Sequence, residues 1–251
     1  MSPLAILLAA LQAARAAGGP PPAAVPFGVG ERFEYSARLG VLTLGTAAIQ
    51  VVGIDTVRSQ PAWHFRFTLD GGNFVFRINS SLESWTSVKE FRSLRFRQDS
   101  KENSRRYLRD YDVFSDSGYY RQHDATATTP TTEAPLDDAS ILYFVRTTPL
   151  EIGQTYRLVR HFKPELNPIV IAVLKREPCE LPDETRVTCL VLNPVVGSNG
   201  LFGNRTDARL WITDDFRRIP VQIKTRQPYG PITLRLEHMT AGAPTARQGP
   251  A

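Results

Sequence analysis

Hydrophobic and polar residues alternate along most of this chain, and a repeat of two residues is typical of β-strands with one buried face. His64, Arg66 and Thr68, for example, are interleaved with aromatic residues. The same alternation recurs in segment after segment, so the pattern predicts a protein built mainly of strands. We expect strands at residues 31–39, 42–54, 62–69, 74–85, 93–98, 107–114, a short one ending at 123, 155–162, 168–176, 186–192, 207–213, 220–226 and 232–238.

Glycine and proline mark where these strands bend or end. Gly45 lies inside a long apolar strand, where a bend or a close approach of two backbones is expected. Residues 70–73 (Asp-Gly-Gly-Asn) have the composition of a hairpin turn, and the returning strand begins at Phe74. Residues 126–135 are rich in Thr, Pro and Ala and predict a surface loop.

One segment has the pattern of a helix instead. We expect a helix over residues 137–146, with Asp137 or Asp138 capping its first turn. Pro149 prevents the helix from continuing. Because a helix of about ten residues is marginal in isolation, it is expected to pack against the sheet.

The expected fold is therefore mostly β: a strongly curved antiparallel sheet or a partly open β-barrel with one short packed helix. Curvature or closure is expected because about a dozen strands in a flat sheet would leave long exposed edges. No linker divides the pattern, so residues 27–240 are expected to form a single β-domain. Residues 18–26 form a Pro/Gly-rich linker before it, and the tail 241–251 is expected to be disordered.

Residues 1–17 have the features of a signal peptide. The apolar run at residues 4–11 has signal-peptide length and is too short to span a bilayer. Ala14 and Ala16 fit cleavage by a signal peptidase, although no basic residue precedes the run. The alternative is the frayed N-terminus of a cytosolic protein. With a signal peptide, the protein is exported and is periplasmic or associated with the cell envelope, and no later segment suits a membrane span.

The formal net charge of +5 raises the question of an anionic partner. Lys and Arg are densest in residues 89–109, where Arg95 and Arg97 alternate with apolar residues and so share one face. A solvated sheet face with ion pairs is the first interpretation. An anionic lipid or polysaccharide headgroup is the second, and no nucleic acid partner is expected of an exported protein.

The sequence contains no recognisable catalytic or metal-binding motif. A Gly-x-Ser-x-Gly nucleophile motif is missing, and the four histidines lie too far apart for a metal-binding spacing. Asp214 and Asp215 would suit a cation site or an acid/base pair. Ion pairs with Arg217 and Arg218 across a tight turn explain the two aspartates better. We therefore predict no catalytic residue, no metal and no cofactor, and a protein that is not an enzyme.

The two cysteines, Cys179 and Cys189, flank a turn that contains Pro182. If two strands meet at this turn, the thiols lie across from each other and form a disulfide, which an oxidising compartment permits. Two free thiols are the second interpretation. A redox or metal pair is the third, and it lacks both the two-residue spacing of redox motifs and a nearby His.

Three stretches of the sequence carry a family resemblance. They are FGVGERFEY (27–35) followed by LGTA (44–47), DASILYFVRT (138–147), and LWITDDFRRIPV (210–221). In these residues, and over roughly residues 27–239, the chain resembles the bacterial exported family known as domain of unknown function 3108. The resemblance implies an envelope protein with an open, barrel-like sheet, similar to periplasmic lipoprotein carriers and capsule-associated lipoproteins. It implies no reaction, and the turn near Leu181 departs from the family's expected Gly-containing turn.

Aromatic residues gather in neighbouring predicted strands and suggest a binding surface. If the sheet stays open, they line an apolar trough suited to an acyl chain. Otherwise they fill the core on the concave side. The expected ligand-facing residues are Trp63, Phe65, Phe67, Phe74, Phe76 and Trp85, with Arg95 and Arg97 as headgroup contacts.

These features leave three functions open. The first is non-enzymatic binding of a hydrophobic or amphipathic ligand, a lipid or glycolipid, inside the curved sheet. The second is a scaffolding or assembly factor that docks another envelope protein through a sheet edge or a charged face. The third, an enzyme acting on cell-wall or capsule polysaccharide, needs a carboxylate cluster that only the fold would assemble. The sequence favours the first.

Overall fold

In the computed structural model of this protein, residues 25–72, 77–197, 202–203, 207–227 and 230–243 are described. Strands account for most of them, and helices are few and short. The helical segments are α2 (Ser140–Thr147), η2 (Ser115–Ser117) and η3 (Pro164–Leu166). The strands are β1 (Arg32–Leu39), β2 (Leu42–Val57), β3 (Gln60–Gly72), β4 (Arg77–Ser87), β5 (Ser93–Glu102), β6 (Arg105–Phe114), β7 (Tyr119–Gln122), β8 (Thr129–Pro130), β9 (Thr155–Leu158), β10 (Ile169–Glu180), β11 (Arg186–Val195), β12 (Arg209–Thr213), β13 (Pro220–Gln227) and β14 (Gly230–Thr240).

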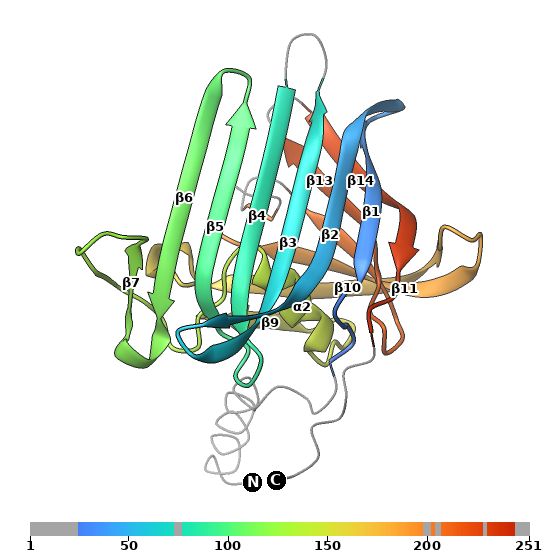
Figure 1. The fold of residues 1–251 in the computed structure, drawn as a ribbon. Coiled ribbons are helices and arrows are strands. Elements are labelled where there is room, and N and C mark those ends of the chain that lie inside the picture. Colours follow the sequence, from blue (N-terminus) through green and yellow to red (C-terminus); the bar gives the residue numbers. More distant parts are fainter. Residues whose placement is uncertain (1–24, 73–76, 198–201, 204–206, 228–229, 244–251) are drawn as a thin grey trace, which may run out of the picture.

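The strands form one antiparallel sheet in which neighbours along the chain are mostly neighbours in space (Figure 1). From edge to edge the order is β8-β7-β6-β5-β4-β3-β2-β1-β14-β13-β12-β11-β10-β9. β1 pairs with both β2 and β14, so the first and last strands meet in the middle of the sheet. Among the described strands β8 and β9 are the edges and do not pair with each other. The fold is therefore a curved, open barrel, which confirms the predicted fold class.

Helix α2 covers the lower part of the concave face. In Figure 1 it lies behind the lower ends of the long strands, whose upper ends stand clear of it. The ring of Tyr143 on α2 stacks on Phe65 of β3, with 3.8 Å between ring centres. Phe27 packs edge-on against Trp63, Phe65 and Tyr143 at 5.1–5.6 Å. These contacts place the aromatic core between the helix and the sheet.

Two glycines allow β2 and β3 to approach closely at their upper ends. A Cβ on Gly45 would lie 2.1 Å from the carbonyl oxygen of Asp70. A side chain at this position would therefore push the strands apart, which confirms the close approach predicted at Gly45. Asp70, Gly71 and Gly72 belong to β3 and pair with β4, so the predicted turn at 70–73 is wrong in its first three residues. The connection at 73–76 lies outside the described residues.

The helix begins at Ser140 rather than at residue 137, because Asp137 caps it from outside. Asp137 Oδ1 accepts hydrogen bonds from the backbone N–H groups of Ala139 and Ser140 at 3.0 and 2.8 Å. Its Oδ2 accepts hydrogen bonds from the hydroxyls of Ser84 and Ser93, both at 2.6 Å. One carboxylate therefore caps α2 and joins it to β4 and β5. Capping by Asp137 is as predicted.

The predicted strands are confirmed, with small changes at their ends. Most continue further than predicted, whereas β9 ends at Leu158. The short strand β8 lies inside the loop predicted at 126–135. The expected signal peptide at 1–17 lies outside the described residues, as do most of the expected linker and tail. In the part of the chain that is described, no helix is long and apolar enough to cross a membrane.

Candidate functional site

A mostly apolar cavity of about 340 Å³ lies on the concave face beside α2. One wall is a row of side chains that stand opposite one another on β3, β4, β5 and β6, namely Phe67, Leu82, Gln98 and Arg109. The helix and the other arm of the sheet complete the lining. The volume lies within the range of small-molecule sites. Ile49 of β2 stands opposite Phe67 and extends the first wall. The apolar residues on the other sides include Ile141, Leu142, Phe202 and Ile223.

A second cavity, of about 330 Å³, adjoins the first and is more polar. Arg109 and Asp138 line both cavities. His161, Lys163 and Glu165 also line the second. An apolar chamber with a charged chamber beside it matches the two parts of an amphipathic molecule.

Two cations in these cavities have no carboxylate partner among the described residues. Arg109 Nη1 donates a hydrogen bond to Gln98 Oε1 at 3.3 Å. Lys163 Nζ donates to the hydroxyl oxygen of Tyr111 at 3.2 Å and lies 4.3 Å from the centre of that ring. Neither contact neutralises the positive charge. A negatively charged ligand group would form stronger, charge-assisted hydrogen bonds with both side chains.

Two buried donors also lie in the cavity walls. The hydroxyl of Tyr143 has no hydrogen-bond partner among the described residues. Burial holds the pKa of Tyr143 well above its ordinary value, so the hydroxyl keeps its proton. The backbone N–H of Lys163 donates to Nδ1 of His161 at 3.1 Å, which places the ring proton on Nε2. That Nε2 lies 3.7 Å from Asp138 Oδ1, beyond hydrogen-bond distance.

Among the described aromatic residues that the sequence assigns to a ligand trough, only Phe67 lines the apolar cavity. Trp63 and Phe65 are 2% and 0% exposed and lie in the core beneath α2. Helix packing fills that part of the concave face. These two residues therefore belong to the hydrophobic core, which was the alternative to a ligand trough. Phe74 and Phe76 lie outside the described residues.

Trp85, Arg95 and Arg97 lie on the convex face, which corrects their predicted place in the trough. Trp85 stands opposite His64 rather than Phe65, and successive residues of a strand point to opposite faces. Arg95 stands opposite Trp85, and Arg97 lies two residues further along β5 on the same side. The indole of Trp85 stacks on the imidazole of His64, with ring centres 4.6 Å apart. These residues therefore belong to the outer surface.

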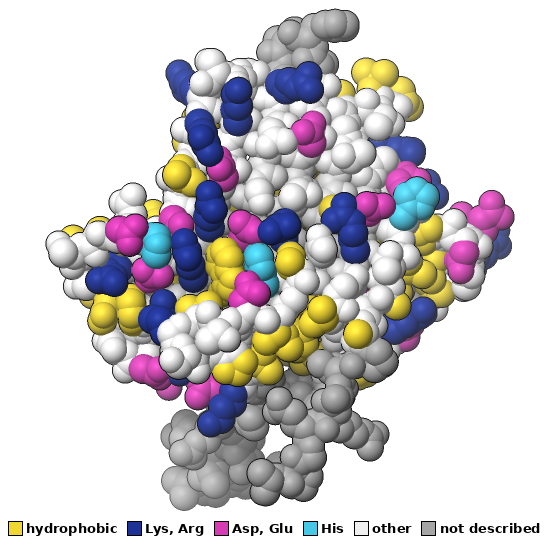
Figure 2. Space-filling view, in the orientation of Figure 1, with side chains coloured by type: hydrophobic (Ala, Val, Ile, Leu, Met, Phe, Trp, Pro, Cys, Tyr) yellow, Lys and Arg dark blue, Asp and Glu magenta, His cyan; other side chains and the backbone are white. Residues whose placement is uncertain are grey.

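Ion pairs cover this convex face, where Figure 2 shows basic, acidic and His side chains interspersed. Arg95 forms two hydrogen bonds with Asp110, at 3.0 and 2.8 Å. Arg66 binds Glu83 at 2.9 and 2.7 Å, and His64 Nε2 lies 3.0 Å from the same carboxylate. Burial alone would raise the pKa of Glu83, but the hydrogen bonds from Arg66 and His64 hold it below its ordinary value. The contacts agree with a solvated face carrying ion pairs.

Arg109, Lys163 and Tyr143 line the cavities but were not predicted from the sequence as site residues. Arg109 alternates with its neighbours so that it shares a face with Tyr107 and Tyr111, and this was visible in the sequence. Which of the two faces is concave was not visible, because it depends on how the whole sheet curves. Lys163 follows β9 in a segment without alternation, so no pattern could place it.

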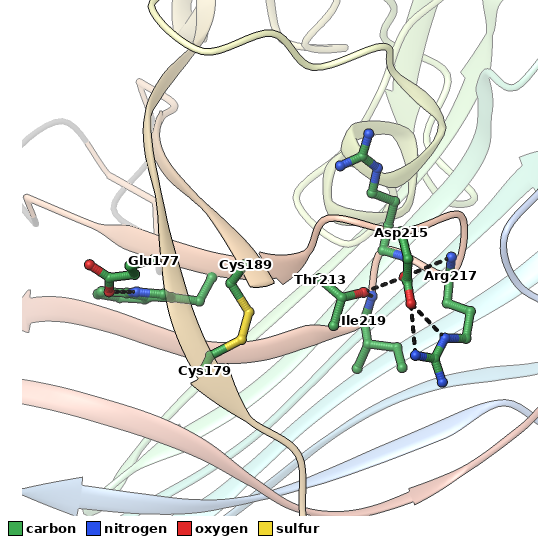
Figure 3. The surroundings of a disulfide bond; sticks show 9 residues. Glu177, Cys179, Cys189, Thr213, Asp215, Arg217 and Ile219 are labelled. Atoms are coloured by element: carbon green, nitrogen blue, oxygen red, sulfur yellow. Dashed lines mark hydrogen bonds and ion pairs between the residues drawn. A yellow bond between two sulfur atoms is a disulfide. The ribbon is translucent and has the colours of Figure 1, made fainter. Parts of the chain in front are cut away.

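A disulfide joins Cys179 to Cys189 in the β10–β11 hairpin (Figure 3), with 6.0 Å between the Cα atoms. The cysteines are not direct cross-strand partners. Cys189 stands opposite Glu177, and Cys179 stands opposite Val187, so the disulfide runs diagonally between the strands. Cys189 is fully buried in the core, and neither cysteine lines the two cavities. The bond connects the hairpin to the core rather than to the candidate site.

Asp214 and Asp215 are held by ion pairs in the turn after β12, and Figure 3 shows Asp215 between Thr213 and Arg217. Asp215 accepts hydrogen bonds from Thr213 Oγ1 at 2.6 Å and from the Arg217 side chain at 2.9 and 2.7 Å. Asp214 Oδ1 accepts one from Arg218 at 3.2 Å. These contacts support the structural interpretation of the pair. No group of three His, Cys, Asp or Glu side chains in the described ranges is placed to hold a metal ion.

Comparison with known proteins agrees with the resemblance in the sequence. The model of the family described as "Protein of unknown function (DUF3108)" matches residues 34–237. The chain belongs to this family. A comparison of the DUF3108 protein with curated proteins gives no match.

Two solved structures resemble this DUF3108 protein at low sequence identity. The β-barrel-like protein of domain of unknown function DUF1849 from Brucella abortus has a TM-score of 0.53 and 9% identity, over 86% of this chain and 99% of that chain. This likeness shows a shared fold alone. The hypothetical protein CT021 from Chlamydia trachomatis has a TM-score of 0.36 and 8% identity, over 89% and 92% of the two chains, and adds no argument.

Proposed function

We propose that this DUF3108 protein is an exported envelope protein that binds an amphipathic molecule with an anionic head group, a lipid or a glycolipid, without catalysing a reaction. The observation that carries the proposal is the apolar cavity joined to a polar one at Arg109 and Asp138. The signal-like residues 1–17 support the export.

The apolar cavity takes the hydrocarbon part of the ligand. Phe67 and Leu82 of the sheet and Ile141 and Leu142 of α2 provide an apolar lining from two sides. Each methylene group removed from water contributes about 0.8 kcal/mol. Affinity should therefore rise with chain length until the cavity is filled and then level off.

The polar cavity takes the head group. Arg109 and Lys163 form no ion pair with a described carboxylate, although Asp138 and Glu165 line the same cavity, and a phosphate or carboxylate placed between the two cations would pair with both. Tyr143 lines the apolar cavity rather than the polar one, and its unpaired hydroxyl is a further donor there. A neutral or cationic head group would leave both cations unpaired, so the site should discriminate against it.

Native mass spectrometry of the protein, purified gently from a bacterial envelope and then extracted with organic solvent, tests the proposal. We expect a stoichiometric adduct of an anionic amphipathic molecule. In a second measurement, the purified protein is titrated with fatty acids of increasing chain length and with matched neutral alcohols. Binding of the acids, but not of the alcohols, should increase with length.

Two arginine variants provide a matched pair for this titration. Arg109→Gln removes a cation from the cavity, and Arg95→Gln removes one from the convex face of the neighbouring strand. We expect about a tenfold loss of affinity in the first variant, the equivalent of one charge-assisted hydrogen bond, and no change in the second. Equal affinity in both variants, or no adduct and no fatty-acid binding, would reject the proposal in favour of protein docking.

A further inference from the structure

The hairpin between β1 and β2 projects apolar side chains into solvent. Val41 is 96% exposed and Leu42 is 63% exposed. Figure 2 shows a hydrophobic group projecting at the upper right, over the end of this hairpin. Single exposed apolar residues are common on proteins, but two in succession at a hairpin tip form a compact anchor that would be stabilised by burial.

Basic residues lie at the same end of the sheet as this hairpin. In Figure 2, Lys and Arg side chains gather over the upper ends of the neighbouring strands. The exposed acidic residues described there, Asp70 and Glu102, are fewer than the basic ones. Positive charge is therefore in excess at this end. The exposed basic residues at these strand ends are Arg77, Lys101, Arg105 and Arg226.

The apolar cavity reaches this same end of the sheet. Glu102 and Tyr107 line it, and Glu102 pairs with Arg105 as the last pair of the β5–β6 ladder. The pairing places Glu102 of β5 level with Gly45 of β2, three strand spacings of about 4.8 Å away. Val41 lies four residues beyond Gly45, so the apolar tip and Glu102 are roughly 20 Å apart. Helix α2 lies at the opposite end of the cavity.

We infer that this end of the sheet docks on the surface of an anionic membrane, with Val41 and Leu42 inserted between the head groups. A lipid surface is anionic outside and apolar inside, which matches basic residues at the same end of the sheet as a projecting apolar tip. The cavity, whose lining reaches this end of the sheet at Glu102 and Tyr107, then lies on the side of the protein that faces the lipids from which its ligand would come. The inference rests on the proposed function, because it identifies the ligand's source as a bilayer.

Flotation of the protein with lipid vesicles tests the inference. The probe is a vesicle of equal parts phosphatidylcholine and phosphatidylglycerol, compared with one of phosphatidylcholine alone. We expect binding to the anionic vesicles only, weakened by salt, because salt screens exposed charges. The double variant Val41→Asp/Leu42→Asp should bind at least about tenfold more weakly, since it loses the apolar anchor and gains two negative charges.

Phe216→Asp is the matched control. Phe216 is 67% exposed and lies in the turn after β12, at the other end of the sheet. This variant should bind the anionic vesicles as the wild type does. Fatty-acid titration without vesicles separates the two proposals, because the double variant should keep normal cavity binding. Vesicle binding that is unchanged in the double variant, or absent in the wild type, would overturn the docking inference even if the cavity binds its ligand.

Discussion

Arg146 and Glu31 form a bidentate ion pair in the protein interior, with Nη1–Oε1 and Nη2–Oε2 distances of 2.6 and 2.9 Å. The two side chains are 1% and 8% exposed. The guanidinium also donates to the carbonyl oxygens of Pro26 and Arg217, at 3.0 and 3.1 Å. A single side chain of α2 therefore connects the segment before β1 with the turn after β12.

Breaking this pair should destabilise the fold strongly. Glu31→Gln leaves the Arg146 guanidinium buried without a counter-charge, which costs about 3–5 kcal/mol. Urea unfolding followed by circular dichroism measures the loss. Arg32→Ala, which breaks an exposed pair with Glu34, is the control and should cost less than about 1 kcal/mol. A loss in Glu31→Gln as small as in the control would mean that the buried pair does not anchor the helix.

The pH dependence of stability should reveal the buried carboxyl group of Asp137. Burial raises its pKa above the ordinary value, although hydrogen bonds from Ser84 and Ser93 oppose the shift. The folded state therefore holds the proton more tightly than the unfolded chain does. The stability that this tighter proton binding gives to the folded state is fully present below the unfolded pKa of about 4. It is lost as the pH rises through the raised pKa of the folded state.

Asp137→Asn tests this reasoning because an amide does not ionise in this range. The variant keeps one oxygen for the N–H groups of Ala139 and Ser140. Urea unfolding of both proteins from about pH 4 upward should show the wild type losing free energy of unfolding relative to the variant. A difference between the two proteins that stays constant with pH would show that the pKa of Asp137 is the same in the folded and unfolded states.

The face on which each predicted ligand residue lies was partly encoded in the sequence. Residues two apart in a strand share a face, so Phe65 and Phe67 fall together. The same rule separates Trp85 from Leu82, since the two residues are three positions apart along β4 and therefore point to opposite faces. Grouping Trp85 with the other aromatic residues ignored this alternation. The ladder then places it opposite His64, on the outside.

What the sequence could not encode is which part of the concave face the helix covers. Trp63, Phe65 and Phe67 follow one another on the same face, yet the first two are buried under Phe27 and Tyr143 and the third lines the cavity. That difference depends on Tyr143 stacking on Phe65, a contact between residues far apart in the chain. Alternation predicts the strands and their faces, but only tertiary packing separates core from cavity.

Two aromatic substitutions should separate the core from the site. Trp63→Ala removes a fully buried side chain and should cost about 3–5 kcal/mol of unfolding free energy. Phe67→Ala enlarges a cavity that already exists, so its cost should be smaller and its effect on ligand affinity larger. Urea unfolding and fatty-acid titration of both variants measure the two effects. Equal destabilisation by both substitutions would place Phe67 in the core.

The disulfide between Cys179 and Cys189 should stabilise the β10–β11 hairpin and leave ligand binding unchanged. It closes a loop with a sequence separation of 10 residues, and neither cysteine touches the cavities. Constraining a loop of this length in the unfolded chain contributes about 2–3 kcal/mol. Cys179→Ala/Cys189→Ala should lose about that much free energy of unfolding, measured in urea against the oxidised wild type.

Alkylation followed by mass spectrometry establishes the oxidation state that this comparison needs. The protein purified from an oxidising compartment should take up no iodoacetamide until it is reduced, and two equivalents afterwards, because both cysteines of the chain are in the bond. Reduced wild type should then unfold at the same urea concentration as the double variant. A reduced wild type as stable as the oxidised one would show that the β10–β11 ladder and the burial of Cys189 already hold the hairpin without the bond.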